Sequence, residues 1–291
     1  MANFIDITPL SEMLGAEISN VDLSSELDSE TINEIKNAWN KYIVLLFRSQ
    51  SLTNQQYVNF SKNFGVLDEA PLDKDGKMMV DGFPELLIVS NIEENGSAVG
   101  SLGNLECEWH TDMSYNPTPP MGSCLYAIEV PNEGGNTGFL NMELAYQALP
   151  ADLKETIAGK RIKHDATHNS AGQIRQGMFK PEDVTKSPGA YHPIVRTHPE
   201  TGRQSLFLGR RPNAYIENFS RSDSEFLLDR IWSHITQSQF IWEHKWRKGD
   251  VLLWDNRNYD KISDFLDESH FVNEHNSIIY KTIKNLLEKN M

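Results

Sequence analysis

The sequence has little of several features, and each shortage excludes a class of protein. Only two of its 291 residues are cysteine, Cys107 and Cys124, which excludes a disulfide scaffold and a CxxC zinc site. No apolar run approaches the roughly 18 residues that suggest a membrane span. The N-terminus has no basic segment followed by a long apolar one, so we expect no secretory signal. These absences predict a cytoplasmic protein without a membrane partner.

Basic residues are also scarce. Lysine and arginine together number 27 against 41 acidic residues, so the formal net charge is -14. A chain this acidic repels nucleic acid unless the fold hides a basic patch, and the basic pair Arg210-Arg211 is expected on a solvated or ion-paired face. There is no glycine-rich phosphate loop to support nucleotide chemistry. A small anionic substrate stays compatible with this charge, because its site needs only one or two cations.

The chain contains no internal repeat, low-complexity tract or long linker, so we expect a single domain over residues 1–291. Apolar periodicity predicts helices at 28–42, 53–63 and 222–237, and one or two short helices within 141–159. Capping boxes are expected at Thr53 with Gln56 and at Ser222 with Glu225. Strands are predicted at 42–47, 85–89 and 251–254, among other short strands separated by Gly, Pro and Asn turns. This arrangement favours a mainly β, α+β fold with antiparallel pairing.

The most informative stretch runs from Glu108 to Tyr115 and reads EWHTDMSY. On an extended segment, His110 and Asp112 would share one face, because strand side chains alternate. An imidazole beside a carboxylate suits a divalent first-row metal, and one more imidazole would complete the facial triad of non-haem iron oxygenases. By itself an HxD pair is weak evidence, since a surface or hydrogen-bonded pair has the same pattern.

Other motifs follow in a consistent order: VLLFR at 44–48, GGNT at 134–137, HPIVRTHPETG at 192–202 and WRKGDVLLWDNR at 246–257. Together with the HxD stretch they resemble the taurine dioxygenase (TauD/TfdA) family of Fe(II)- and 2-oxoglutarate-dependent dioxygenases. The resemblance implies a double-stranded β-helix, or jelly roll, with flanking helices. It also implies that His110 and Asp112 bind Fe(II) and that Thr137 contacts the carboxylate of 2-oxoglutarate.

Two residues that this family places after the WDNR segment are missing. Lys261 occupies the position of the second iron-binding histidine, and a protonated lysine has no lone pair for a metal. The nearest substitutes are Asp260, which would give one histidine and two carboxylates, and the later His270 and His275. Asp260, His270 or neither could supply the third ligand.

The second missing residue is the arginine that pairs with the distal carboxylate of 2-oxoglutarate. No arginine follows Arg257, and Lys281 stands where the family has it, while Ser277 matches a further family arginine. Lysine would pair with a carboxylate as a point charge, without a two-pronged geometry. The departure begins abruptly after Arg257, which suggests a changed reading frame or a rebuilt C-terminal segment.

The sequence therefore predicts an oxygenase that hydroxylates a small, anionic organic substrate and converts 2-oxoglutarate to succinate and CO2. The alternative is a non-catalytic relative that binds a small acid or a partner. The resemblance also allows a homo-oligomer, either a dimer or a tetramer. His164, Asp165 and His168 have metal-like spacing, but a polar surface or substrate-lid segment is the favoured interpretation.

Overall fold

The structure is a computed structural model that describes residues 5–73, 75–102, 107–257, 259–263 and 277–284. Its α-helices are α1 (Ser29–Tyr42), α2 (Asn54–Lys62), α3 (Met142–Gln147), α4 (Ala151–Ile157) and α5 (Arg221–Ile235). Single 3-10 turns are η1 (Val184–Lys186), η2 (Arg211–Asn213) and η3 (Ser238–Phe240). None of the helices in these ranges is both long enough and apolar enough to cross a membrane.

The strands of the first half are β1 (Asp6–Pro9), β2 (Ala16–Ser19), β3 (Val44–Phe47), β4 (Val66–Leu67), β5 (Leu86–Ser90), β6 (Glu93–Glu94), β7 (Ser97–Ala98), β8 (Ser101–Leu102), β9 (Gly122–Ala127) and β10 (Thr137–Asn141). Those of the second half are β11 (Arg161–Lys163), β12 (Tyr191–Pro193), β13 (Val195–Thr197), β14 (Gln204–Leu206), β15 (Tyr215–Ile216), β16 (Ile241–His244), β17 (Val251–Asp255), β18 (Tyr259–Ser263) and β19 (Ser277–Lys284).

The predicted helices are confirmed, with one correction to a cap. The side chain of Asp28 accepts from the amide of Thr31 at the start of α1, and Thr53 and Gln56 form the expected capping box on α2. The cap of α5 is Ser220, which accepts from the amide of Asp223. The prediction of Ser222 as the cap was wrong, because the helix begins two residues earlier than a cap at Ser222 requires, and both serines fit the same sequence signature.

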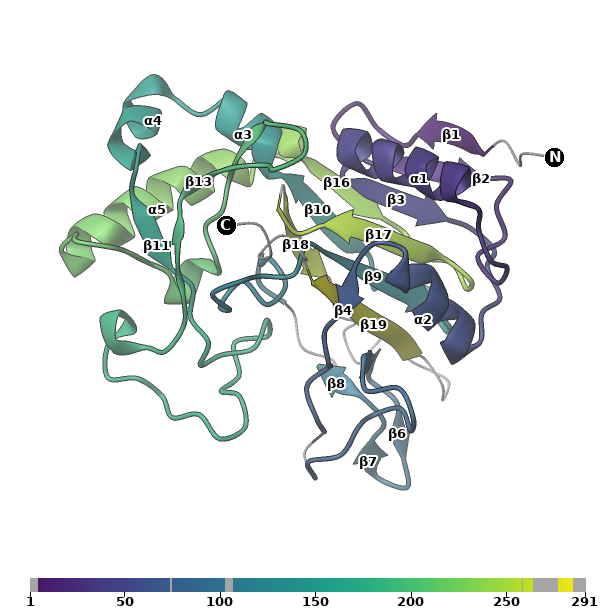
Figure 1. Cartoon of the computed structure of the whole chain (residues 1–291). Helices are drawn as coiled ribbons and strands as arrows, with labels where there is room; N and C mark the ends of the chain where they lie inside the picture. Colours follow the sequence, from purple (N-terminus) through teal and green to yellow (C-terminus); the bar gives the residue numbers. More distant parts are fainter. Residues whose placement is uncertain (1–4, 74, 103–106, 258, 264–276, 285–291) are drawn as a thin grey trace.

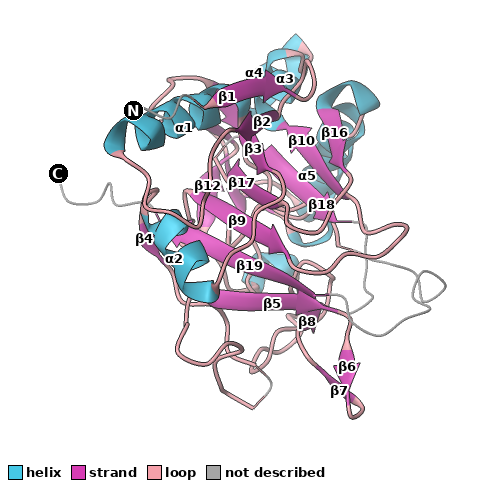
Figure 2. Ribbon diagram, turned by 90° about the vertical axis from the view of Figure 1, so that its right-hand side faces the viewer, coloured by secondary structure: helices cyan, strands magenta, loops and turns pink. Residues whose placement is uncertain are grey.

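The strands form one large sheet and several small ones. Along the large sheet the order is β1-β2-β3-β17-β9-β19-β5-β8, and β4 pairs with β19. Figure 2 shows the middle of this sheet, where β17, β9, β19 and β5 lie side by side. Most pairs are antiparallel as predicted, but β2 pairs with β3 and β5 pairs with β8 in parallel. The strand β19, from the divergent C-terminal segment, therefore lies inside the sheet rather than at its edge.

Both faces of the large sheet are buried along β3, β9 and β17. On β3, β9 and β17 alternate residues point to opposite faces, as the period of a strand requires. One set, including Phe47, Cys124 and Leu253, packs with α1 and α2, which cover that face in Figure 1. The other set, including Leu46 and Trp254, packs against Phe139 of β10 in the three-stranded sheet β16-β10-β18. The large sheet thus lies between two helices and a second sheet.

A separate cluster of buried residues joins the helices on the left of Figure 1 to the small strands near them. It packs Leu153 of α4 and Ile231 of α5 against Ile162 of β11 and Leu206 of β14. This part of the molecule supplies the segment around residues 164–192, which covers the HxD loop described below.

Candidate active site

The HxD residues lie in a loop that precedes β9. His110 occupies an isolated bridge position, and residues 112–115 form a turn rather than a strand. The prediction of an extended segment was therefore wrong. The turn is closed by hydrogen bonds from the amide of Ser114 to the carbonyl of Thr111 (3.4 Å) and from the amide of Asn116 to that of Met113 (3.0 Å). The reversal still brings the two predicted side chains together, with His110 Nε2 lying 3.4 Å from Asp112 Oδ1.

His110 has the tautomer that a metal ligand needs. Its Nδ1 lies 2.7 Å from the carbonyl oxygen of Glu108, which can only accept, so Nδ1 carries the proton and donates. Nε2 then keeps its lone pair and faces the carboxylate of Asp112. A hydrogen bond to a backbone carbonyl on the remote nitrogen is the usual way that proteins orient a metal-binding histidine. Both side chains are buried, so the pair is shielded from bulk water.

The second oxygen of Asp112 is held by the large sheet. Trp254 of β17 donates its indole N–H to Asp112 Oδ2 at 3.2 Å, and Trp254 is fully buried. Its hydrogen bond to the site was not predicted from the sequence. The signal lay in its position inside a motif of the family, immediately before the DNR sequence.

Thr137, the predicted 2-oxoglutarate contact, is the first residue of β10 and is buried. It follows Gly134 and Gly135, whose φ angles of 72° and 69° fall in the left-handed region that glycine tolerates best. Its hydroxyl oxygen accepts from the indole N–H of Trp246 at 2.9 Å. An accepted bond leaves the hydroxyl proton available to donate, as a contact with a carboxylate would require.

The segment with His164, Asp165 and His168 is not a polar surface. Both His164 and Asp165 are buried, so that part of the prediction was wrong. Asp165 accepts from His168 Nδ1 (2.8 Å) and from Arg210 (3.2 Å), while the ring of His164 stacks on Phe207. Among the described residues these side chains form no metal-binding group. Asp165 and His168 pair with each other, whereas neither ring nitrogen of His164 has a hydrogen-bond partner among the described residues.

The same segment is attached to both ends of the HxD loop. At one end the amide of Glu108, two residues before His110, donates to the carbonyl of Ser170 at 2.9 Å. At the other end the amide of Ala190 donates to the carbonyl of Tyr115 at 3.0 Å. Arg175 adds a contact by lying over the Tyr115 ring, 4.2 Å from its centroid. The loop therefore depends on this segment for its position.

The WDNR motif forms a buried clamp at the end of β17. Arg257 donates from Nη2 to Asp255 Oδ2 at 2.6 Å, and Nε2 of His198 donates to the same oxygen at 3.0 Å. Burial alone would raise the pKa of Asp255, but the charge of Arg257 and the bond from His198 outweigh it and bring the pKa to about 2. Asn256 donates to the hydroxyl of Ser123 at 3.0 Å. The clamp determines where the chain enters its divergent segment.

The C-terminal predictions fall partly outside the described structure. Lys261 lies in β18 opposite Phe139, Asp260 lies opposite Leu140, and Lys281 lies in β19 between Cys124 and Leu86. The side chains of these three residues are outside the described part of the chain, as are His270 and His275 entirely. Among the described residues no group of three or more His, Cys, Asp and Glu side chains could hold a metal.

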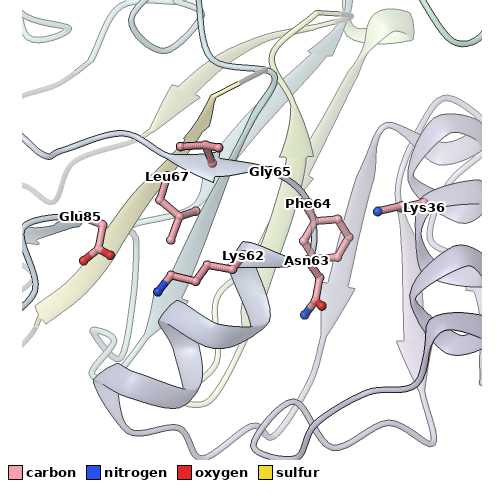
Figure 3. Close-up of a pocket in the computed structure, with 8 residues that line it drawn as sticks. Lys36, Lys62, Asn63, Phe64, Gly65, Leu67 and Glu85 are labelled. Atoms are coloured by element: carbon pink, nitrogen blue, oxygen red, sulfur yellow. The ribbon is translucent and has the colours of Figure 1, made fainter. Parts of the chain in front are cut away.

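Two surface hollows among the described residues are lined by residues other than the predicted site residues. One, of about 570 Å³, is drawn in Figure 3 and lies between α1, α2 and β4, where Lys36 and Lys62 flank Asn63 and Phe64. The other, of about 480 Å³, has Trp246 in its wall, the residue that holds Thr137. Neither contains His110 or Asp112.

Residues 6–259 match the model of the family described as "Taurine catabolism dioxygenase TauD, TfdA family". The chain is 32% identical to the alpha-ketoglutarate-dependent 2,4-dichlorophenoxyacetate dioxygenase of Cupriavidus pinatubonensis, over 86% of this chain and 88% of that protein. It is 31% identical to an alkylsulfatase of Acinetobacter baylyi, over 92% of this chain and 83% of that protein.

Solved structures extend the similarity further along the chain. The structure of AAD-2 in complex with Mn(II) and N-oxalylglycine matches with a TM-score of 0.79 and 30% identity, covering 97% of this chain and 98% of that one. A taurine dioxygenase from Burkholderia xenovorans matches with a TM-score of 0.77 and 30% identity, covering 97% of this chain and 89% of that one. The family model, by contrast, stops two residues after the WDNR motif.

Residues 250–291 also match the model of the DnaB-like helicase N-terminal domain, a stretch too short to establish membership of that family. The TauD model spans most of the chain, from β1 to the start of β18, and includes the loop, the clamp and both indole contacts. On that extent of agreement, the chain belongs to the TauD/TfdA family of dioxygenases.

Proposed function

We propose that this chain is an Fe(II)- and 2-oxoglutarate-dependent dioxygenase that hydroxylates a small anionic organic substrate and releases succinate and CO2. The observation that carries the proposal is the paired arrangement of His110 and Asp112. The Glu108 carbonyl directs the imidazole lone pair toward the carboxylate, and Trp254 holds the far carboxylate oxygen. The proposal includes a double-stranded β-helix, which the two facing sheets around Phe139 support.

His110 and Asp112 would supply two ligands of Fe(II), and they fit that role in donor type and tautomer. Thr137 would donate its hydroxyl to a carboxylate of 2-oxoglutarate, and Lys281 would pair with the distal carboxylate. Bound Fe(II) and 2-oxoglutarate would supply the activation of dioxygen. The protein's contribution is to orient the ligands and to exclude water, for which the burial of His110, Asp112 and Thr137 is suited.

Arg175 supports an anionic substrate. Its guanidinium is half-buried, lies over Tyr115 and donates to the Tyr115 hydroxyl (3.1 Å) and the His168 carbonyl (3.1 Å). It forms no ion pair with any described carboxylate, although acidic residues outnumber basic ones in the chain. A half-buried cation is stabilised when an anion pairs with it. Arg175 contacts Tyr115, which lies three residues beyond Asp112 in the sequence. We propose that Arg175 binds the acidic group of the substrate.

Several relatives act on such compounds by name. They include the 2,4-dichlorophenoxyacetate dioxygenase and the sulfate ester dioxygenase of Pseudomonas putida, which is 30% identical over 87% of this chain. An aryloxyalkanoate or an alkyl sulfate therefore heads the list of candidate substrates. We also propose that residues 1–291 form one domain acting in the cytoplasm on small molecules, as a monomer or a homo-oligomer.

The test is anaerobic titration with Fe(II), followed by addition of oxygen, 2-oxoglutarate and each candidate acid, with succinate as the readout. The wild type should release succinate, and release should increase with the right acid. The variants His110→Ala and Asp112→Ala should release none. Equal succinate from wild type and both variants would mean that the metal site lies elsewhere.

One observation favours a second candidate, a non-catalytic relative that binds a small acid. The family model ends at residue 259, and Lys261 stands where the resemblance calls for a metal-binding histidine. Under this alternative the wild type binds an aryloxyacetate but releases no succinate at any Fe(II) concentration. Succinate release that depends on Asp260 or His270 would instead identify a replacement ligand and end the alternative.

A further inference from the structure

The turn that carries Asp112 has few constraints of its own. Met113, the next residue, has a φ of 48°, in the left-handed region that non-glycine residues seldom adopt. Of the two hydrogen bonds that close the turn, one is long, at 3.4 Å. A turn of this kind keeps one conformation only when its surroundings hold it.

His192, which lies outside the loop, constrains the turn by hydrogen bonds. Its Nε2 lies 2.8 Å from the carbonyl oxygen of Ser114 and 3.0 Å from that of Asn116. Both partners can only accept, so Nε2 carries the proton and donates to both. The carbonyl between them, that of Tyr115, accepts from the amide of Ala190. Three consecutive carbonyls, which begin two residues after Asp112, are thus held by Ala190 and His192 of one segment.

The position of the His192 ring is itself well determined. The residue is buried in β12, where it pairs with Ile162 of β11. The ring meets Phe207 and His164 edge-on, with centroids 5.2 and 4.9 Å away. Burial lowers the pKa of His192 to about 4, so at neutral pH the ring is uncharged and its single proton is on Nε2. This proton is committed to the turn and is not available for acid–base chemistry.

We propose that His192 is a positioning residue, which orients the Asp112 carboxylate by fixing the carbonyls of residues 114 and 116. The inference rests on the proposed role of Asp112 as a ligand of Fe(II). Groups outside the ligand set that orient it commonly change metal affinity by about 10- to 100-fold when they are removed.

His164 offers a matched control in the same cluster. Its ring is also buried, stacks on Phe207 with centroids 4.6 Å apart, and touches His192. Neither of its ring nitrogens has a hydrogen-bond partner within the described residues. The two histidines therefore share burial and packing, and only His192 is hydrogen-bonded to the turn.

Three variants distinguish the effect of the His192 hydrogen bond on the turn from the effect of ring packing. His192→Phe keeps an aromatic ring but removes the donor, His192→Gln keeps an N–H at a similar reach, and His164→Phe changes the ring without a bond to the turn. Two properties are measured for each: hydrogen exchange of the amides of Ser114 and Asn116 in metal-free protein, and the dissociation constant for Fe(II). Thermal melting verifies that each variant is folded.

For His192→Phe we expect exchange of these two amides to become about tenfold faster and Fe(II) binding to weaken about tenfold. His192→Gln should recover most of both, and His164→Phe should stay within about twofold of the wild type. Unchanged exchange in His192→Phe, or an equal effect in His164→Phe, would overturn the proposal. If the wild type binds no Fe(II), the proposed function fails, while the exchange rates still decide whether His192 positions the turn.

Discussion

The indole N–H of Trp254 lies 3.2 Å from Oδ2 of Asp112, although the two residues are 142 positions apart in the chain. This bond connects the middle of the large sheet to the loop with the proposed metal ligands. It also leaves Oδ1 of Asp112 facing His110. The sheet therefore determines which carboxylate oxygen of Asp112 faces His110.

Trp254→Phe should weaken Fe(II) binding by about tenfold, because the carboxylate loses the donor that orients it while an aromatic ring stays in the core. The dissociation constant, measured by anaerobic titration, decides the result. Trp242→Phe is the control, since Trp242 contacts the same Phe139 ring but not the carboxylate. An equal loss in both variants would mean that packing, not the hydrogen bond, is responsible.

Asp255→Asn should reduce the free energy of unfolding by about 3–5 kcal/mol, because it leaves the buried guanidinium of Arg257 without its closest partner. Glu200→Gln removes the exposed partner of the same arginine and should cost less than about 1 kcal/mol. Urea unfolding of both variants measures the difference.

The same carboxylate predicts a dependence on pH. Its folded pKa of about 2 lies below the ordinary value of 3.8, so its contribution is complete above about pH 4 and is lost as the pH falls through 2. Asp255→Asn should remove this part of the acid sensitivity. A variant that loses stability between pH 4 and 2 as steeply as the wild type would contradict the assignment.

Arg175→Met should weaken binding of phenoxyacetate by roughly tenfold while leaving binding of the neutral phenoxyacetamide unchanged, because only the acid has a charge to pair. The affinity of Arg175→Lys for phenoxyacetate should lie between those of the wild type and Arg175→Met. Arg230→Met, which removes an exposed ion pair with Asp152, is the control. Equal losses for the acid and the amide would mean that Arg175 contributes shape rather than charge.

Lys261→His should tighten Fe(II) binding, and adding Lys281→Arg should tighten 2-oxoglutarate binding, because the first supplies a lone pair and the second a two-pronged donor. Lys261→Arg is the matched control, since it keeps the charge and has no lone pair. Both dissociation constants are measured by calorimetry without oxygen. No gain from either substitution would mean that the divergent segment does not bring position 261 to the metal.

Local features of this protein followed from the sequence because neighbouring residues determine them. The helices of residues 29–42 and 54–62 could be predicted from apolar spacing and from caps such as Asp28 and Thr53. The His110–Asp112 pair could be recognised because both residues lie within three positions of the sequence. The family followed from motifs that occur in order along the chain.

Tertiary structure alone decided how the site is held. The HxD segment turns instead of extending, because its conformation depends on His192 and Ala190, more than 70 residues away. The indoles of Trp246 and Trp254 look like ordinary core residues in the sequence, since burial and hydrogen bonding to a distant site leave the same apolar pattern. Local sequence determines the apolar periodicity and the caps of the helices. The hydrogen-bond partners of Asp112 and Thr137 depend instead on which strands lie next to one another in the folded sheets.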